Sequence, residues 1–194
     1  STVLSMVVAV PLGILAGSRH RRAEDVTLSV VSQLGIAVPT FWAGLLLIVV
    51  FGVHWQVFPA QGFPRHGWDE PGRAIKSLVL PTITLALSQG AVLLRFVRSA
   101  VLDVLHQDYI RTARAKGLTR TQALYRHGLR NASLPIISIL GVQVASLIAG
   151  VVVIERVFNL PGVGQMLVRD IGARDLEKVQ GTVLLLAILV LVLG

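Results

Sequence analysis

The chain has no cysteine, and it lacks the common motifs of enzymes that use a bound phosphate, a zinc ion or a serine nucleophile. Without cysteine it can form no disulfide, thiolate metal site or cysteine nucleophile. It contains no G-x-x-x-x-G-K-[ST] phosphate loop, no H-E-x-x-H motif and no G-x-S-x-G turn. We therefore predict no catalytic residue, no metal site and no cofactor bound by this chain, which cannot hydrolyse ATP by the usual loop.

Acidic residues are also scarce, and all of them fall outside the long apolar runs or at their ends. Ion- and proton-coupled carriers commonly use a carboxylate inside the membrane, because a buried ionisable group is tolerated there only when it has a function. This scarcity weakens the hypothesis of a secondary carrier, which stays open as an alternative. The ten acidic residues are Glu24, Asp25, Asp69, Glu70, Asp103, Asp108, Glu155, Asp170, Asp175 and Glu177.

A membrane enzyme or scaffold is a third hypothesis, and the sequence offers it no convincing group of residues. His106 and His127 lie in a polar loop, which is a poor place for a shielded reaction site. We interpret both as surface residues.

Long apolar runs dominate what is present: 54% of the residues are hydrophobic, and the mean hydropathy is +0.73. A helix needs roughly 20 apolar residues to cross a hydrocarbon layer of about 30 Å. We predict an all-α, polytopic membrane helical bundle that forms a single domain over residues 1–194. Its five expected spans cover about residues 1–17, 26–52, 78–101, 135–154 and 179–193.

Three prolines should mark these spans. Pro39 lies in the middle of the second span and is expected to kink it. Pro81 and Pro135 are expected in the first helical turns of the third and fourth spans, where a missing N–H costs nothing. The first run has no starting Met and no basic lead-in, unlike a signal peptide. We expect the chain to be a fragment that lacks N-terminal material.

Positive charge gathers in two of the loops. Lys and Arg number 18 against 10 Asp and Glu. The stretch from residue 95 to 130 holds eight basic residues against two acidic ones, and the turn after the first span contains Arg19, Arg21 and Arg22. Because cytoplasmic loops retain positive charge, we predict that this turn and the loop 102–134 lie inside, and that the loops 53–77 and 155–178 lie outside. The charge therefore indicates topology and not nucleic-acid binding.

Two arginines fall late in the third expected span. Arg95 and Arg98 lie near its inner end, where long side chains can reach water at the membrane surface. We assign them no role in transport.

The inner loop should contain two short helices. The first, about Asp108 to Lys116, has an acidic start and a basic end, as the helix dipole favours, and Gly117 follows as a stop. Thr119 and Gln122 have the spacing of a capping box, which predicts a second helix over about residues 120–131. From composition alone, such a loop could dock on a partner protein or lie on anionic lipid.

The segment DYIRTARAKGL at 108–118, continued by RHGLRNASLP at 126–135, resembles the cytoplasmic loop of binding-protein-dependent ABC importer permeases of the dipeptide, oligopeptide and nickel branch. Residues 151–175, VVVIERVFNLPGVGQMLVRDIGARD, resemble the outer loop before the last span in the same branch, and FPAQGF at 58–63 is a weaker match. Arg111 and Thr112 stand where many permeases have Glu and Ala. The resemblance implies a type I permease of six spans, five of them in this fragment.

The resemblance also implies roles for named residues and partners. The helix Tyr109 to Lys116 would dock on an ATPase and couple its closure to motion of the spans. The implied docking residues are Tyr109, Arg111, Thr112, Ala113, Arg114, Lys116 and Gly117. The implied partners are a second related permease, two ABC ATPase subunits or domains that bind ATP and Mg, an extracytoplasmic substrate-binding protein and membrane lipid. The implied location is a bacterial or archaeal cytoplasmic membrane.

Polar residues inside the spans are candidates for the transport pathway. Gln33, Gln89 and Gln143 carry amides that suit a weakly selective peptide pathway, although amide side chains also hold helices together in lipid. A short helix is expected over residues 163–171 of the outer loop, where the resemblance implies contact with the binding protein. The family includes importers of dipeptides, oligopeptides, glutathione and nickel complexes, and the sequence does not choose among them.

Overall fold

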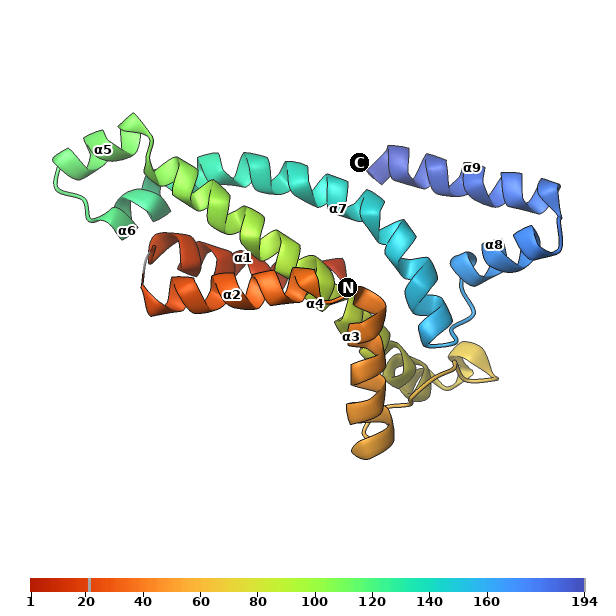
Figure 1. Cartoon of the computed structure of the whole chain (residues 1–194). Helices are drawn as coiled ribbons and strands as arrows, with labels where there is room; N and C mark the ends of the chain where they lie inside the picture. The colour runs from red at the N-terminus through yellow and green to blue at the C-terminus, as the bar shows by residue number, and fades with distance from the viewer. Residues whose placement is uncertain (21, 194) are drawn as a thin grey trace. The chain divides into compact units, whose positions relative to one another are not determined.

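The computed structural model describes residues 1–20 and 22–193, without the side chains of residues 148, 149 and 193 (Figure 1). Arg21, one of the arginines expected inside, lies outside the described residues. The described residues form helices and connecting loops without a strand, which confirms the all-α prediction. The α-helices are α1 (Thr2–Ser18), α2 (Ala23–Ala37), α3 (Thr40–Leu47), α4 (Pro71–Leu105), α5 (Asp108–Ala115), α6 (Arg120–Ala123), α7 (Leu129–Val157), α8 (Val163–Gly172) and α9 (Leu176–Leu193).

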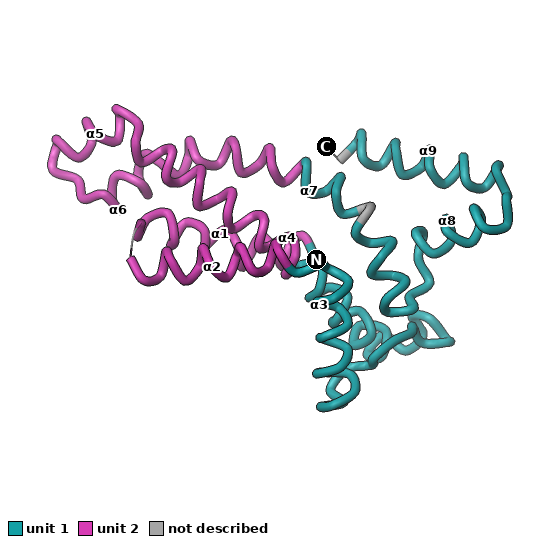
Figure 2. The backbone as a smooth tube through the Cα atoms, viewed as in Figure 1, with its two compact units in different colours: residues 1, 38–86, 142–194 teal, residues 2–37, 87–141 magenta. Residues whose placement is uncertain are grey.

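Three shorter stretches have other helical geometries. They are the π-helix η1 (Ile48–His54), the 3₁₀-helix η2 (Gly67–Asp69) and the π-helix η3 (Leu124–Gly128). The chain divides into two compact units, residues 1, 38–86 and 142–194 in unit 1 and residues 2–37 and 87–141 in unit 2 (Figure 2). Helices α4 and α7 each contribute residues to both units.

Length and composition single out α4 as a membrane-spanning helix. It has 35 residues, and among the described residues it is the one helix that alone is long and apolar enough to cross a membrane. The number of candidate membrane spans rises to three if each of two bent pairs of helices is taken as one span. These pairs are Ala23–Ala37 with Thr40–His54 and Arg120–Leu147 with Gly150–Val157. The five spans expected from the sequence stay a prediction.

The helix boundaries differ from those expected at the prolines. At Pro39 the helix is interrupted and not merely kinked: α2 ends at Ala37, and Pro39 has an extended ψ of 135° before α3 begins. The residue before a proline avoids the α-helical region, which favours this break. The Pro39 carbonyl oxygen then accepts hydrogen bonds from the N–H groups of Trp42 and Ala43, which start α3.

The prediction that Pro81 and Pro135 occupy first helical turns is wrong. Pro71 is the first residue of α4, so Pro81 lies inside that helix, and Pro135 lies inside α7. Both helices begin in polar sequence before the apolar run, because charged and amide side chains continue a helix as readily as apolar ones. For the same reason the expected inner helix 120–131 does not end before Pro135: α6, η3 and α7 follow one another without a gap.

In unit 2, α1 packs closely on α4 through small residues. A Cβ added to Gly13 would lie 2.7 Å from Val97 Cβ, and one added to Gly17 would lie 2.6 Å from Val101 Cγ1. Real Cβ atoms do not approach so closely, so only glycine permits this spacing. Small residues that let two backbones approach are typical of helix pairs in membranes. Val97 and Val101 are fully buried in the core of this unit.

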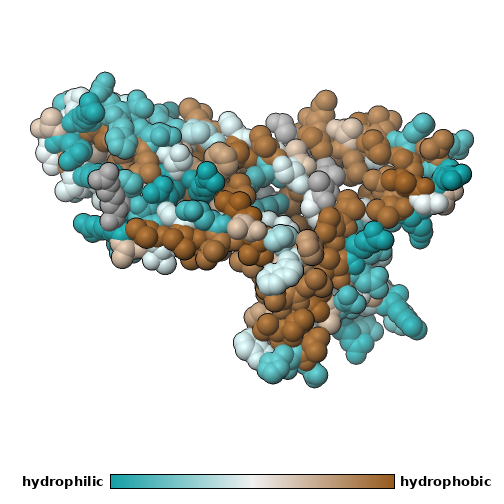
Figure 3. All heavy atoms as spheres, viewed as in Figure 1, coloured by the Kyte–Doolittle hydropathy of each residue, from teal (hydrophilic) through white to brown (hydrophobic). Residues whose placement is uncertain are grey.

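In unit 1, a second core forms around Phe158, which is 1% exposed. Ile48, Leu80, Ile154 and Leu160 complete its buried part. Apolar side chains also cover the visible face of α3, whereas hydrophilic ones gather over α5 and α6 (Figure 3). Exposed residues of α3 include Phe41, Trp42, Leu45 and Leu46. Exposed apolar surface of this kind is typical of a helix face that contacts lipid or another helix.

Candidate functional site

Helix α5 begins and ends where the sequence places its boundaries. Asp108 is its first residue, and Gly117 follows its end with a φ of +95°. The Gly117 N–H donates to the Arg114 carbonyl oxygen (3.0 Å), and the Leu118 N–H donates to that of Ala113 (3.3 Å). These two bonds form a Schellman motif, which satisfies the last carbonyl groups of the helix. A Cβ at Gly117 would meet open space, so it is the left-handed backbone that favours glycine here.

Two faces of α5 have opposite characters. Ile110 and Ala113 are 0% and 8% exposed and belong to the core of unit 2. The opposite face carries Thr112 and Ala115, which are exposed. The helix is therefore fixed to its own chain by one side and presents the other to its surroundings.

The seven residues predicted for docking are thus not equivalent. Ala113 packs inside the chain, so it can contribute to docking only by holding α5 in place. Arg111 also contacts Asp108, at 3.4 Å from Nη1 to Oδ1, and the Thr112 hydroxyl donates to the Asp108 carbonyl oxygen. The six that the structure exposes are Tyr109, Arg111, Thr112, Arg114, Lys116 and Gly117. Docking itself stays a prediction for all seven.

The predicted capping box is confirmed at the start of α6. The Gln122 N–H donates to Thr119 Oγ1 (3.2 Å), and Gln122 Oε1 accepts from the Thr119 N–H (3.0 Å). The following residues, Ala123 and Leu124, are fully buried in the same core as Ile110. The loop 102–134 is therefore packed onto the helix that precedes it and leads directly into the helix that follows.

A buried ion pair in unit 2 joins α2 to α4. Arg98 donates from Nε to Asp25 Oδ1 (2.5 Å) and from Nη2 to Oδ2 (3.1 Å). Asp25 is 3% exposed, and its carboxylate also lies 3.1 Å from His20 Nδ1 and 3.4 Å from Ser29 Oγ. The sequence led us to expect that Arg98 can reach water at the membrane surface, and its side chain is 26% exposed; the sequence did not show that it also binds a carboxylate. Sequence reasoning missed this pair because the partners are 73 residues apart.

A second polar assembly, in unit 1, holds the predicted outer helix. That helix is confirmed as α8. Glu155 Oε2 accepts from the Gln165 N–H (2.9 Å), and Gln165 Nε2 donates back to the Glu155 carbonyl oxygen (2.8 Å). A carboxylate that accepts an N–H in the first turn is favoured by the helix dipole. This arrangement resembles a capping box whose two residues come from different helices.

The two glycines of the outer segment make room for that carboxylate. A Cβ on Gly162 would lie 2.0 Å from Glu155 Oε1, and a Cβ on Gly164 would lie 2.7 Å from Val152 Cα. The segment 58–63 joins the same assembly, since Gln61 Nε2 donates to the Val157 carbonyl oxygen (2.9 Å) and the Gly62 N–H to that of Phe158 (2.8 Å). Two segments that are distant in sequence thus form one structure.

The three glutamines predicted to line a pathway lie on three helices and do not share one environment. Gln33 on α2 is exposed, Gln89 on α4 is partly buried, and Gln143 on α7 is 6% exposed. Gln143 also belongs to a different unit from the other two. Their role in a pathway stays a prediction. Within residues 1–20 and 22–193, no group of three or more His, Asp or Glu residues could hold a metal ion.

Comparison with known proteins gives a consistent result. Residues 9–194 match the family described as "Binding-protein-dependent transport system inner membrane component". The chain is 40% identical to the oligopeptide transport system permease protein AppB of Bacillus subtilis, in an alignment that covers 99% of this chain and 61% of that protein. It is 37% identical to the dipeptide transport system permease protein DppB of Escherichia coli, over 99% of this chain and 63% of that protein. The chain therefore spans about three fifths of the length of these relatives.

Proposed function

This chain belongs to the family of binding-protein-dependent transport system inner membrane components, and on that premise we propose that it is the membrane-spanning permease subunit of an ATP-driven peptide importer. A separate ATPase subunit would dock on α5 at the cytoplasmic face and would bind ATP and Mg. The further partners would be a second related permease, a second ATPase subunit or domain and an extracytoplasmic binding protein. Transport would proceed by alternating access.

The observation that carries this proposal is the two-sided packing of α5. A docking element that transmits force needs an exposed surface for the partner and a firm attachment to the moving helices. Thr112 and Ala115 provide the first, and Ile110 and Ala113 provide the second. Because Ile110 shares a core with Val101 of α4 and Ala132 of α7, displacement of α5 would be passed to α4 and to the start of α7 and not absorbed in a loose loop.

The outer assembly supports the second half of the proposal. Glu155, Gln165 and the two glycines fix the start of α8, and Gln61 ties the segment 58–63 to it. A rigid surface binds a partner at a smaller entropy cost than a mobile loop does. We propose that this assembly receives the binding protein.

Peptide is the cargo that the relatives' names favour, since one is an oligopeptide and the other a dipeptide permease protein. A nickel complex or glutathione are the alternatives within the same kind of importer. Mass spectrometry of the ligand that copurifies with the binding protein separates them: bound peptides support the proposal, and a bound nickel complex or glutathione contradicts it.

The docking role is tested by a bulky substitution on the exposed face of α5. In the reconstituted complex, Thr112→Trp should reduce both peptide uptake and the stimulation of ATPase activity by the loaded binding protein. The amount of chain in the membrane should not change, because Thr112 is exposed and does not belong to the core. Ala113 is unsuitable for this test, since a larger side chain there would overfill the core.

A matched control lies on the same loop. Tyr125 in η3 is 60% exposed and is not part of α5. Tyr125→Trp should leave uptake and stimulated ATPase activity as in the unmodified complex. Normal uptake by the Thr112→Trp complex would refute docking through this face.

A further inference from the structure

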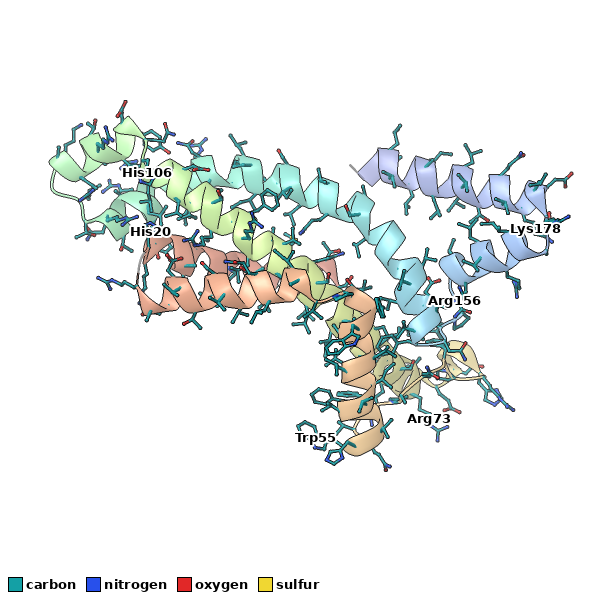
Figure 4. The ribbon with its side chains drawn as sticks, viewed as in Figure 1. His20, Trp55, Arg73, His106, Arg156 and Lys178 are labelled. Carbon is teal, nitrogen blue, oxygen red and sulfur yellow. The ribbon has the colours of Figure 1, made fainter. Side chains whose placement is uncertain are left out.

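Two adjoining hollows open on the outer segment of unit 1, where α7 ends and α8 begins. They share the side chains of Gln165 and Arg169. Figure 4 labels Arg156, which belongs to the smaller hollow and lies beside the start of α8 in that view. The smaller hollow, of about 310 Å³, is lined by Val152, Arg156, Asn159, Gln165, Val168 and Arg169. The larger one, of about 500 Å³, adds Pro161, Gly162, Val163 and Met166.

The two arginines of these hollows have no acidic partner in the described part of their own chain. Arg156 and Arg169 are both exposed, and neither takes part in an ion pair there. None of the described residues that line the hollows carries a carboxylate. The carboxylates next to them in sequence are occupied or buried, since Glu155 accepts the Gln165 N–H and Asp170 is 7% exposed. Positive charge around a concave surface attracts an anionic group.

Hydrogen bonds and close packing fix the wall that the two hollows share. The side chain of Gln165 donates to the Glu155 carbonyl oxygen (2.8 Å), which holds it in one position. Gly162 and Gly164 pack so closely against α7 that a Cβ on either would clash. A partner therefore meets a wall that is already in place, which lowers the entropy cost of binding.

The lining indicates a protein side chain as the anionic group. In the smaller hollow Val152 and Val168 lie beside the arginines, and this suits the short apolar stem of an Asp or Glu whose carboxylate meets the guanidinium groups. In the larger hollow Val163 and Met166 are 43% and 41% exposed. Methionine adapts its shape to many apolar partners. An acidic residue with an apolar neighbour fills both hollows at once.

We propose that the binding protein inserts an acidic side chain between Arg156 and Arg169 and rests an apolar neighbour of that side chain against Met166. The inference rests on the proposed function, which places the binding protein at this outer assembly, and it names the chemistry of the contact. Arginine anchors beside apolar pockets are typical of the residues that dominate protein interfaces. The charge pair also steers the encounter and fixes the orientation in which the binding protein arrives.

The first test measures binding of the binding protein and not transport. The purified complex in phosphatidylcholine nanodiscs is titrated with the peptide-loaded binding protein, as the unmodified complex and as the Arg169→Gln variant. Loss of a charged hydrogen-bond partner should weaken binding about tenfold and should also reduce its dependence on salt. Arg174→Gln is the matched control, since Arg174 is exposed in the same outer segment and lines neither hollow. It should bind as the unmodified complex does.

A second measurement identifies the acidic partner. Arg169→Lys keeps the positive charge and introduces a primary amine, which a water-soluble carbodiimide joins to a contacting carboxylate as an amide. Mass spectrometry should find this amide on an Asp or Glu side chain of the binding protein. The Arg174→Lys complex, treated in the same way, should not form it.

Three results would overturn the proposal. The first is equal affinity of the unmodified and Arg169→Gln complexes, or an equal loss in Arg169→Gln and Arg174→Gln. The second is an amide to the terminal carboxylate of the peptide, which would assign the hollow to the cargo. The third is a loss of affinity in Arg169→Gln that needs phosphatidylglycerol in the nanodisc, which would assign the hollow to a lipid. Each leaves the Thr112→Trp test intact, whereas a binding protein that does not bind the unmodified complex would contradict the proposed function as well.

Discussion

Removing the charge of Asp25 should destabilise this chain much more than removing the exposed charge of Arg95 on the neighbouring helix α4. The perturbation is Asp25→Asn, which keeps the size of the side chain and removes its negative charge. Asp25 is 3% exposed and binds Arg98 through both carboxylate oxygens, at 2.5 and 3.1 Å. The substitution leaves the Arg98 guanidinium facing a neutral amide with little access to water.

The expected magnitude follows from burial. Breaking a fully buried ion pair by removing one partner costs about 3–5 kcal/mol, because the remaining charge is left uncompensated. The Arg98 side chain is 26% exposed and can recover some hydration, so we expect a cost near the lower end, about 3 kcal/mol. For a chain of this size, about 3 kcal/mol corresponds to a melting temperature lower by about 6–12 °C.

The assay is thermal unfolding of the purified complex with four variants. Arg98→Gln should cost about as much as Asp25→Asn, since it leaves Asp25 buried without its partner. The double variant should cost less than the sum of the two single ones and no more than either of them, because no uncompensated charge remains. Arg95→Gln, an exposed arginine on the same helix, should change stability by about 0.5 kcal/mol or less.

Two outcomes would refute this reasoning. If Asp25→Asn melts at the same temperature as Arg95→Gln, the pair does not contribute to stability. If the costs of the two single variants simply add in the double variant, the two residues do not interact.

Two further predictions concern unit 1. Gly164→Ala should cost about 1–3 kcal/mol of stability, because the added Cβ would lie 2.7 Å from the Val152 backbone. Gly172→Ala should cost less, because a Cβ there meets nothing within 4 Å. The melting temperature should therefore be lower for Gly164→Ala than for Gly172→Ala. The Lys178 side chain and N–H, bonded to the Asp175 carboxylate, hold the pKa of Asp175 below its usual range. The ion pair of Asp175 therefore stabilises the folded chain at a pH above the pKa of Asp175 in the unfolded chain, and this stabilisation is lost as the pH falls through the lower pKa of Asp175 in the folded chain. Carboxyl NMR should show that Asp175 titrates below the usual range for Asp, and Lys178→Met should raise its pKa.

Local chemistry made parts of the site predictable. The stop at Gly117, the capping box of Thr119 and Gln122, and the helix after Gly162 all depend on residues within a few positions of one another. For such features, spacing alone specifies the backbone hydrogen bonds. The structure confirms each of them.

The features that sequence reasoning missed depend on distance in sequence. The pairs Asp25 with Arg98 and Gln61 with Val157 join residues 73 and 96 positions apart, and no local rule selects those partners. The starts of the helices that contain Pro81 and Pro135 were misplaced for a different reason. The start of an apolar run shows where the apolar surface begins, and the helix itself begins earlier, in polar sequence. The inward position of Ala113 was hidden because a small residue suits both a docking surface and a core.

The absence of cysteine makes the central claim directly measurable, since each introduced thiol is the only one in the chain. Ala115 on α5 and Ala173 at the end of α8 are both exposed alanines. In intact cells a membrane-impermeant maleimide should label the Ala173→Cys variant but not the Ala115→Cys variant. After the cells are opened it should label Ala115→Cys once the ATPase subunits are removed, and less while they are bound. Labelling of Ala115→Cys from outside, or equal labelling with and without the ATPase subunits, would contradict a cytoplasmic docking role for α5.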